Sequence, residues 1–560
     1  MRRGALCAAL LVCLALAGTG PAAAQVSKPG STPAISRTLP GKPTGPNALV
    51  APKRDDVPPE GRSLTARRVG ALADAREEVR RERREYPGST REVLLKGSAQ
   101  WQVSYYAKTP VGSPRKEIAQ VLVDDASGEV LEAWTDYKVA WSMARGYPGA
   151  FGRIVNAPWV WIPLALLFVA PFLRRPRRML HLDLLVLSAF SLSLALFNAA
   201  HIAASVPTVY PLLGYLLVRM LWIGVHRRGH EAEEARRPLA LLVPVSWLAI
   251  AVIFLVGFRV ALNVSDSNVI DVGYAGVIGA DKIADGSKLY GAFPKDNENG
   301  DTYGPVVYEV YMPFEQAWGW SGSWDKLPAA HIAAIVFDLL ACLLCFLVGR
   351  RVRGPDMGIV FAYAWASYPF TLYAQMSNAN DALVAVLVLA AIWTAGSAPA
   401  RGAFVALAGL TKFAPLALAP LLACYPRPRL RTILWFGLGF AVAALIAAAP
   451  LVAHNDLRSF WDATIAFQAE RGSPFSLWGL YEPKWVDTAQ RAVQIGGVVL
   501  ALALAFIPRR TDLVGLAACA AAIVIALQLG VTHWFYLYIP WFFPLVIIAL
   551  LGRWGAPERA

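Results

Sequence analysis

Four ionisable residues of this 560-residue chain stand inside or close to apolar segments, where charge is conspicuous. Lys412 interrupts the run 402-GAFVALAGLTKFAPLALAPLLACY-425, and Asp271 follows another apolar run by less than a dozen residues. A cation within an apolar segment is unfavourable unless it is paired or solvated, so Lys412 is a candidate for binding a phosphate. Asp271 could act as a general base, and Arg471 and His533 could complete a clamp around a leaving phosphate. A surface arginine and an interfacial histidine are the alternative interpretations of the last two. These residue types predict transfer of a group from a phosphate to a hydroxyl.

The preferred base is Asp271. It lies near enough to the membrane surface to reach a lipid donor, and burial beneath a loop would raise its pKa toward the working range. A solvated loop carboxylate is the alternative interpretation, and Asp266 is the alternative base. Asp281 and Asp285 are expected on a short amphipathic helix, 272-VGYAGVIGADKIADG-286, which ends at a glycine.

Three polar residues, Asn378, Asn380 and Asp381, lie at the outer end of a predicted span and are candidates for binding substrate. Helix capping at the start of 381-DALVAVLVLAAIW-393 is an equally good interpretation, and the two roles can coexist.

Several further residues have a functional and a structural interpretation. Tyr290, Tyr303 and Pro305 are expected to shape a loop over the substrate, and the tyrosine faces could stack on a sugar or pack in the core. The intramembrane Asp338 is expected to pair with another helix. External carboxylates could hold a divalent cation, but no ligand spacing requires one, so neither a metal site nor a cofactor is predicted.

The elements that must position these residues are apolar. Hydrophobic residues make up 56% of the chain and charged residues 16%, with a mean hydropathy of +0.44. Repeated apolar runs of about 18 residues or more are typical of a polytopic helical membrane protein. The net charge of +14 comes from short basic clusters between these runs, which is the pattern of cytoplasmic loops and argues against a nucleic-acid partner. The predicted spans lie near 156–173, 179–199, 207–225, 238–262, 329–349, 357–375, 381–396, 432–453, 489–507, 512–530 and 536–552.

The chain divides by composition. Residues 1–24 have the basic start, apolar middle and small-residue end of a secretory signal peptide, so the segment that follows is expected outside the cytoplasm. Residues 25–62 are rich in Pro, Ser, Thr and Lys and predict a disordered linker. Residues 155–560 form the predicted membrane domain.

Between linker and membrane domain, residues 63–150 predict a small extracytoplasmic α+β domain. A helix is expected over 63–87, capped by Ser63, and strands within 100–109 and 117–135. The stretch 121-VLVDDASGEVLEAW-134 resembles the end of a PepSY-type domain, which implies a binding or regulatory module without catalysis.

An external start predicts which loops are cytoplasmic, and nearly every basic cluster falls on that side. The active site and the N-terminal domain are then extracytoplasmic, and the C-terminus is cytoplasmic. Because 402–425 has basic residues at both flanks and Thr411, Lys412 and Pro415 at its centre, a re-entrant pair of half-helices is predicted there. The predicted cytoplasmic segments are 174-RRPRR-178, 226-HRRGHEAEEARR-237, 350-RRVR-353, 401–431, 508-PRR-510 and the tail at Arg553.

Short motifs from about residue 240 to 552 resemble, in their shared order, the glycosyltransferase-C superfamily, in particular its polyprenyl-phosphate-sugar-dependent mannosyltransferase-like branch. The resemblance implies a membrane enzyme that moves a hexose or pentose, with mannose favoured, from a polyprenyl-phosphate donor to an external lipid or glycan acceptor. Asp271 would be its base. Ser377 and Asn378 stand where the family has Gly-Gln. The motifs are Asp271, 286-GSKLY-290, 303-YGPVVYEVYMP-313, 377-SNAN-380, 407-LAGLTKFAP-415, 471-RGSPFSLWGL-480 and 533-HWFYLYIPWFFP-544.

Two other function classes remain open. A transporter would also tolerate broken helices and intramembrane charge, but inverted repeats and midplane sites would be expected, and no repeat relates the two halves. A sensor or scaffold built around the external domain would leave Lys412 and the loop 271–313 without a purpose.

Overall fold

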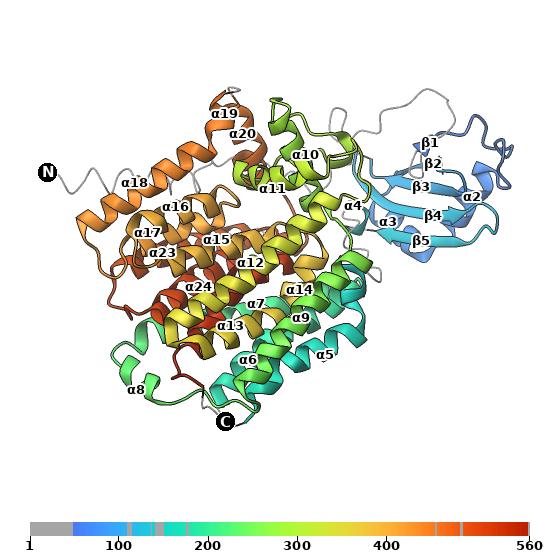
Figure 1. The fold of residues 1–560 in the computed structure, drawn as a ribbon. Coiled ribbons are helices and arrows are strands. Elements are labelled where there is room, and N and C mark those ends of the chain that lie inside the picture. The colour runs from blue at the N-terminus through green and yellow to red at the C-terminus, as the bar shows by residue number, and fades with distance from the viewer. Residues whose placement is uncertain are drawn as a thin grey trace. The chain divides into compact units, whose positions relative to one another are not determined.

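The computed structural model describes residues 49–108, 115–135, 137–140, 151–174, 178–453, 456–481 and 485–557. The chain divides into two compact units. The N-terminal unit extends to Tyr147 and also includes the short segment Phe197–Ile202, and the helical unit contains Pro148–Leu196 and Ala203–Ala560. Figure 1 shows the sheet of the first and the helices of the second. The predicted signal peptide and most of the predicted linker lie outside the described residues.

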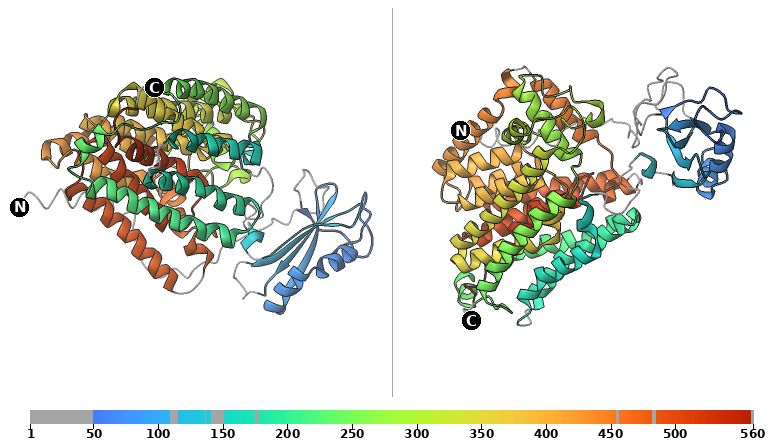
Figure 2. Two further views of the ribbon diagram at one scale, coloured as in Figure 1. Left: turned by 90° about the horizontal axis from the view of Figure 1, so that it is seen from below. Right: turned by 45° about the vertical axis from the view of Figure 1, so that its right-hand side comes forward.

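The N-terminal unit is an antiparallel five-stranded sheet in the order β1-β2-β3-β4-β5. Alternate residues of β3, Trp101, Val103 and Tyr105, belong to the hydrophobic core of this unit. The residues between them are buried too, so β3 is covered on both faces. Two helices, α2 and α3, pack against the sheet (Figure 2). The elements are β1 (Leu49–Val50), α2 (Ala66–Asp74), α3 (Glu77–Glu85), β2 (Thr90–Lys96), β3 (Gln100–Tyr106), β4 (Glu117–Asp124), β5 (Val130–Thr135) and α4 (Tyr137–Ala140).

This unit has the predicted α+β character but differs from the prediction in detail. The helix expected over 63–87 is two helices, and its first cap is Thr65, whose hydroxyl accepts the Arg68 amide at 3.1 Å, and not Ser63. Strands β1 and β2 were not predicted, and β1 lies within the predicted linker. A two-residue strand has too short a pattern to recognise before its partner is known.

The helical unit contains seven helices that are long and apolar enough to cross a membrane, among the residues that the structure describes. They correspond to seven of the predicted spans. Three more predicted spans appear as shorter apolar helices at Pro158–Phe172, Asp381–Trp393 and Tyr536–Leu551. In Figure 1 the long helices α9, α12 and α18 slant in the same direction.

The helices and short helical turns of this unit are η2 (Arg153–Asn156), α5 (Pro158–Val169), η3 (Ala170–Phe172), α6 (Arg178–Asn198), α7 (Ile202–Leu221), η4 (Trp222–His226), α8 (Glu231–Arg236), α9 (Val245–Asp266), α10 (Asp271–Ala284), η5 (Lys295–Asn297), α11 (Pro305–Ala317), α12 (Pro328–Arg353), α13 (Pro355–Ser367), α14 (Pro369–Met376), α15 (Asp381–Trp393), α16 (Ala398–Gly409), η6 (Ala414–Leu418), α17 (Ala419–Ala423), α18 (Leu430–Ala447), α19 (Ala449–Ala453), α20 (Leu457–Trp461), η7 (Asp462–Ala466), α21 (Phe467–Glu470), α22 (Leu477–Leu480), α23 (Trp485–Phe506), α24 (Leu513–Gly530), η8 (Tyr536–Tyr538) and α25 (Ile539–Leu551).

The span predicted over 357–375 is not one helix. It is divided into α13 and α14 between Ser367 and Pro369. Proline has no amide hydrogen and disfavours helical geometry in the residue before it, so a helix restarts at Pro369 instead of passing through it.

The run 402–425 has the broken form that the sequence predicts. Helix α16 ends at Gly409, and η6 and α17 return from Ala414 to Ala423. The guanidinium of Arg401 donates to the carbonyl oxygens of Leu422 and Tyr425, both at 3.0 Å, so the two ends of the segment meet. We call residues 398–425 the hairpin, with residues 410–413 as its tip.

A buried ion pair joins two long helices. Arg259 of α9 donates to Asp338 of α12 at 2.9 Å, and the two side chains are 1% and 2% exposed. Trp365 donates to the same carboxylate at 2.9 Å. The prediction that Asp338 pairs with another helix is confirmed.

Candidate active site

Lys412 lies at the tip of the hairpin and is paired. Its ammonium group is 2.6 Å from Oδ1 of Asp381, the first residue of α15, and Trp541 of α25 donates to the same oxygen at 3.0 Å. The Lys412 side chain is 10% exposed and that of Asp381 1%. The pair satisfies the requirement that a cation among apolar helices be compensated. A phosphate would use the remaining hydrogens of the ammonium group.

Three aromatic rings surround the same ammonium group. The Lys412 nitrogen lies 5.3 Å from the ring centroids of Tyr303 and Trp541 and 5.7 Å from that of Tyr538. These distances allow cation–π attraction from each ring. The rings come from three elements, so this aromatic box joins the loop before α11 to η8 and α25.

The tip of the hairpin is bonded directly to the loop that carries Tyr303. The amides of Gly304 and Val306 donate to the carbonyl oxygens of Thr411 and Leu410, each at 3.3 Å. A Cβ at position 304 would lie 1.8 Å from the Leu410 oxygen, so only glycine permits this approach.

Asp271 is the first residue of α10, with its side chain exposed. Asn297 donates to its carbonyl oxygen at 3.0 Å. The first turn of α10 rests on the turn at Asn378, because a Cβ at Gly273 would lie 2.1 Å from the Asn378 oxygen. The predicted helix over 272–286 is confirmed, except that Asp271 belongs to it and Gly286, at φ +63°, follows its end.

The Asp271 carboxyl group is reached by solvent, yet the surrounding protein removes enough water that desolvation raises its pKa above the ordinary value. The neighbouring charges of Arg471 and Lys412 and the Val272 amide partly oppose this effect, while Asp381 reinforces it. A carboxylate at a helix N-terminus is also favoured by the helix dipole. Asp271, Asp381, Lys412 and Arg471 therefore share one electrostatic environment.

His533 belongs to the same group of side chains. Burial and the charges of Arg471 and Lys412 hold its pKa well below the ordinary histidine value. A lowered pKa favours the neutral form of the imidazole. Ser473 Oγ lies 2.8 Å from Nδ1 of His533 and accepts the Phe475 amide at 3.2 Å, so its hydroxyl hydrogen can point to Nδ1. Nε2 of His533 then carries the proton and is a donor.

Four of the five predicted substrate contacts are fully buried inside the protein: Asn378, Tyr290, Asn380 and Asp381. Asn378 accepts a hydrogen bond from Asn263 at 2.9 Å and donates to Ser267 and Asn268 at 3.0 and 2.9 Å, with no exposed surface. Its backbone is in the left-handed region at φ +48°. Asn378 thus fixes the segment between α9 and α10 instead of facing a ligand.

Tyr290 is the second of these. Its hydroxyl donates to the carbonyl oxygen of Tyr303 at 2.8 Å, and its ring packs on Tyr308 and Phe460. The Leu289 and Tyr290 amides donate to the buried carboxylate of Asp456 at 3.1 and 3.4 Å. Tyr290 therefore supports Tyr303 from behind.

The remaining predicted residues, Asp266, Asn380 and Asp381, differ in where they lie. Asp266 ends α9 and forms an exposed ion pair with Arg153 at 3.5 Å, and it is not among the groups that act on Asp271. Asn380 is fully buried beside Asp381, and both polar atoms of its amide lack a hydrogen-bond partner within the described residues. Asp381 also begins α15 as predicted, but the Asn380 side chain does not cap that helix.

Sequence reasoning did not single out Tyr538, Trp541 and Ser473. The segment 533-HWFYLYIPWFFP-544, which contains Tyr538 and Trp541, was identified only as one of the family-like motifs. The distance between Lys412 and these rings depends on how helices far apart in sequence pack, and no local pattern encodes it. In the described part of the chain, no group of three or more His, Cys, Asp or Glu side chains could hold a metal ion.

The family model for glycosyltransferase family 87 matches residues 302–536, which is less than half of the chain. No curated protein matches the chain. The match includes Tyr303, Asp381, Lys412, Arg471 and His533, whereas Asp271 precedes it and Trp541 follows it. Together with the seven candidate spans, the match indicates a membrane glycosyltransferase.

Proposed function

We propose that the chain transfers a hexose or pentose, with mannose favoured, from a polyprenyl-phosphate donor to a lipid or glycan acceptor on the extracytoplasmic face, with Asp271 as the general base. The observation that supports this most is the position of Asp271. It is an exposed carboxylate at the start of α10, within the electrostatic reach of Arg471 and of Lys412 at the tip of the hairpin.

In this reaction, an acceptor hydroxyl attacks the anomeric carbon of the donor sugar as the bond from that carbon to the phosphate oxygen breaks. Asp271 takes the hydroxyl proton, and the polyprenyl phosphate leaves with the electron pair of the broken bond. Arg471 and the remaining hydrogens of Lys412 balance the charge on the leaving phosphate, and Nε2 of His533 donates a neutral hydrogen bond. Tyr303 offers an aromatic face to the sugar.

Asp271→Asn should lower the transfer rate by about 10²–10⁴-fold, because the amide cannot take the proton. The measurement uses purified protein in lipid with a radiolabelled polyprenyl-phosphate mannose and extracted lipids as acceptors. Asp266→Asn is the matched control, since it removes a carboxylate only five positions away that pairs with Arg153, and it should keep near-normal activity.

Equal activity of Asp271→Asn and wild type would remove Asp271 as the base. If wild type transferred sugar from no lipid-linked donor, the proposal would fail and the transporter or scaffold interpretation would replace it. The same assay with EDTA tests whether a divalent cation is required. We predict that none is, so transfer should continue when EDTA is present.

The residues proposed for these steps all belong to the helical unit. We propose that the N-terminal unit is a binding or regulatory module, in line with the PepSY-like turn. In that turn the Ser127 amide and hydroxyl both donate to Asp124, at 2.8 and 2.7 Å, and Gly128 lies at φ +71°.

A further inference from the structure

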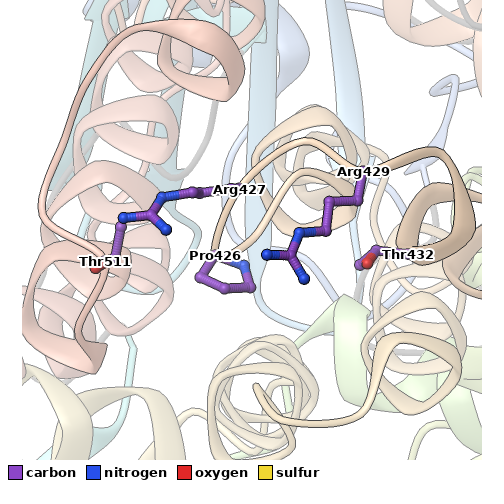
Figure 3. Close-up of a pocket in the computed structure, with 5 residues that line it drawn as sticks. All are labelled: Pro426, Arg427, Arg429, Thr432 and Thr511. Carbon is purple, nitrogen blue, oxygen red and sulfur yellow. The ribbon is translucent and has the colours of Figure 1, made fainter.

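A small pocket lies at the end of the hairpin remote from Lys412. It has a volume of about 200 Å³ and is lined by Pro426, Arg427, Arg429, Thr432 and Thr511. In Figure 3 the guanidinium of Arg429 points toward Pro426, and that of Arg427 lies on the side of Thr511. Two cations and two hydroxyl groups are therefore grouped around one small space.

This pocket is separate from the candidate active site. Thr511 precedes α24 and His533 follows it. An 18-residue helix is about 27 Å long. The pocket therefore lies at the opposite end of the bundle, within and directly after the segments 401–431 and 508–510, which the charge pattern predicts to be cytoplasmic.

The two arginines of the pocket, Arg427 and Arg429, are not paired with any residue that the structure describes. Both side chains are exposed, and neither makes a hydrogen bond or ion pair with any described residue. The carboxylate nearest in sequence to Thr511, Asp512, is already paired with Arg510 at 2.7 Å. The positive charge is therefore not neutralised within the described chain.

Further positive charge lies behind the pocket. Three arginines, Arg351, Arg401 and Arg509, act electrostatically on the hydroxyl of Tyr425, the residue before Pro426, together with one carboxylate, Asp512. That hydroxyl donates to the Thr511 carbonyl oxygen at 2.8 Å. Arg509 is only 6% exposed, and its Nε has no hydrogen-bond partner among the described residues. A group with several negative oxygens would satisfy this arrangement best.

The neighbouring helix surface favours a lipid as the source of that group. Helix α18 begins directly after Arg429, and only 17% of its apolar window is buried. Leu430, Leu434, Leu438 and Val442, each four positions apart, are 63%, 54%, 52% and 49% exposed. Positions at this spacing form one face of a helix. An acyl chain can follow this face while its headgroup occupies the pocket.

We propose that the pocket binds the phosphate of an anionic phospholipid headgroup at the membrane face opposite the active site. Arg427 and Arg429 contact the phosphate oxygens, Thr432 and Thr511 donate hydrogen bonds, and the acyl chain lies along α18. Basic pockets between helices on the cytoplasmic side are suited to such headgroups. The N-terminal end of α18 adds favourable dipole potential.

The test is native mass spectrometry of the full-length protein with phosphatidylglycerol or phosphatidylcholine. Phosphatidylglycerol should bind preferentially, and Arg427→Gln and Arg429→Gln should each weaken its binding about fivefold. Arg431→Gln is the matched control, because Arg431 is exposed two positions from Arg429 but does not line the pocket, and it should bind as wild type does. Arg429→Lys, which keeps the charge, should retain most of the binding.

Three results would overturn the proposal. An equal loss of phosphatidylglycerol binding in Arg431→Gln would mean that the lipid responds to the general surface charge and not to the pocket. Equal binding of phosphatidylcholine would mean that the anionic headgroup is not recognised. Displacement of the lipid by excess inorganic phosphate would assign the pocket to a soluble phosphate. Thermal unfolding of each variant shows that a loss of binding is not a loss of fold, and Arg427, which lies outside α18, provides the second position if Arg429→Gln is unstable.

Discussion

At the scale of single residues, the candidate site contains two carboxylates, Asp271 and Asp381, and two cations, Lys412 and Arg471. Lys412 is held by Asp381, so Arg471 is the cation that acts most strongly on Asp271. Asp271 works as a base only when it is ionised. Because its pKa is raised, activity should be lost on acidification at a higher pH than for an ordinary aspartate.

Arg471→Gln should move this loss of activity to still higher pH. The Arg471 charge favours ionised Asp271, and without it the pKa of Asp271 rises further. The measurement is the pH dependence of kcat/KM, whose midpoint can be read even when the amplitude falls.

Arg471→Lys keeps the charge and should leave the midpoint near the wild-type value. An unchanged midpoint in Arg471→Gln, with lowered activity, would show that Arg471 does not set the ionisation of Asp271.

At the scale of elements, the approach of the loop at Gly304 to the tip of the hairpin holds Tyr303 beside Lys412. Gly304→Ala should displace this contact, because the new Cβ would lie 1.8 Å from the Leu410 oxygen. A misplacement of about 1 Å at an active site can lower the rate roughly hundredfold. Transfer rate and thermal unfolding together separate a displaced site from an unfolded protein.

Gly437→Ala is the control for this substitution. Gly437 lies inside α18 with open space around its Cβ position, so alanine should leave the rate unchanged. Full activity of Gly304→Ala would show that the contact has no role in positioning Tyr303.

The sequence predicted most of the helices but only part of the site. Apolar run length located the long helices, and the basic flanks with Lys412 at mid-length predicted the broken form of 402–425. Pro369 divides the span predicted over 357–375 into two helices, and the length of an apolar run does not reveal such a break. Asn378 and Tyr290 were assigned to substrate because polar and aromatic residues in a loop have the same sequence signature whether they face a ligand or hold the backbone. Trp541 could not be found, since only packing brings it to Asp381.

At the scale of the whole molecule, the helices differ in how much of their surface meets other protein. Helix α24 is 83% buried, whereas α9 and α18 are each 17% buried. Predominantly apolar helices that other protein leaves uncovered are expected to face lipid. The helical unit therefore has the burial pattern of a membrane bundle with α24 at its centre.

The predicted orientation can be tested with single cysteines. The four cysteines within the described residues are buried, so they should give little background. Ser287→Cys, in the loop after α10, should react with a membrane-impermeant maleimide on intact cells, whereas Arg228→Cys, in a predicted cytoplasmic loop, should react only after lysis.

Both positions are exposed, so a difference between them reports the side of the membrane and not burial. The reverse pattern would place the candidate site in the cytoplasm and contradict an extracytoplasmic acceptor.

The aromatic box around Lys412 has a consequence for biosynthesis. Its parts are contributed by Tyr303, Tyr538 and Trp541, so the ribosome must deliver nearly every helix before the ammonium group is enclosed. Until α25 has been synthesised, Lys412 and Asp381 of a nascent chain lack Trp541, which contacts both of them. A stop codon introduced between residues 480 and 530 should therefore give an inserted intermediate whose hairpin tip is incomplete.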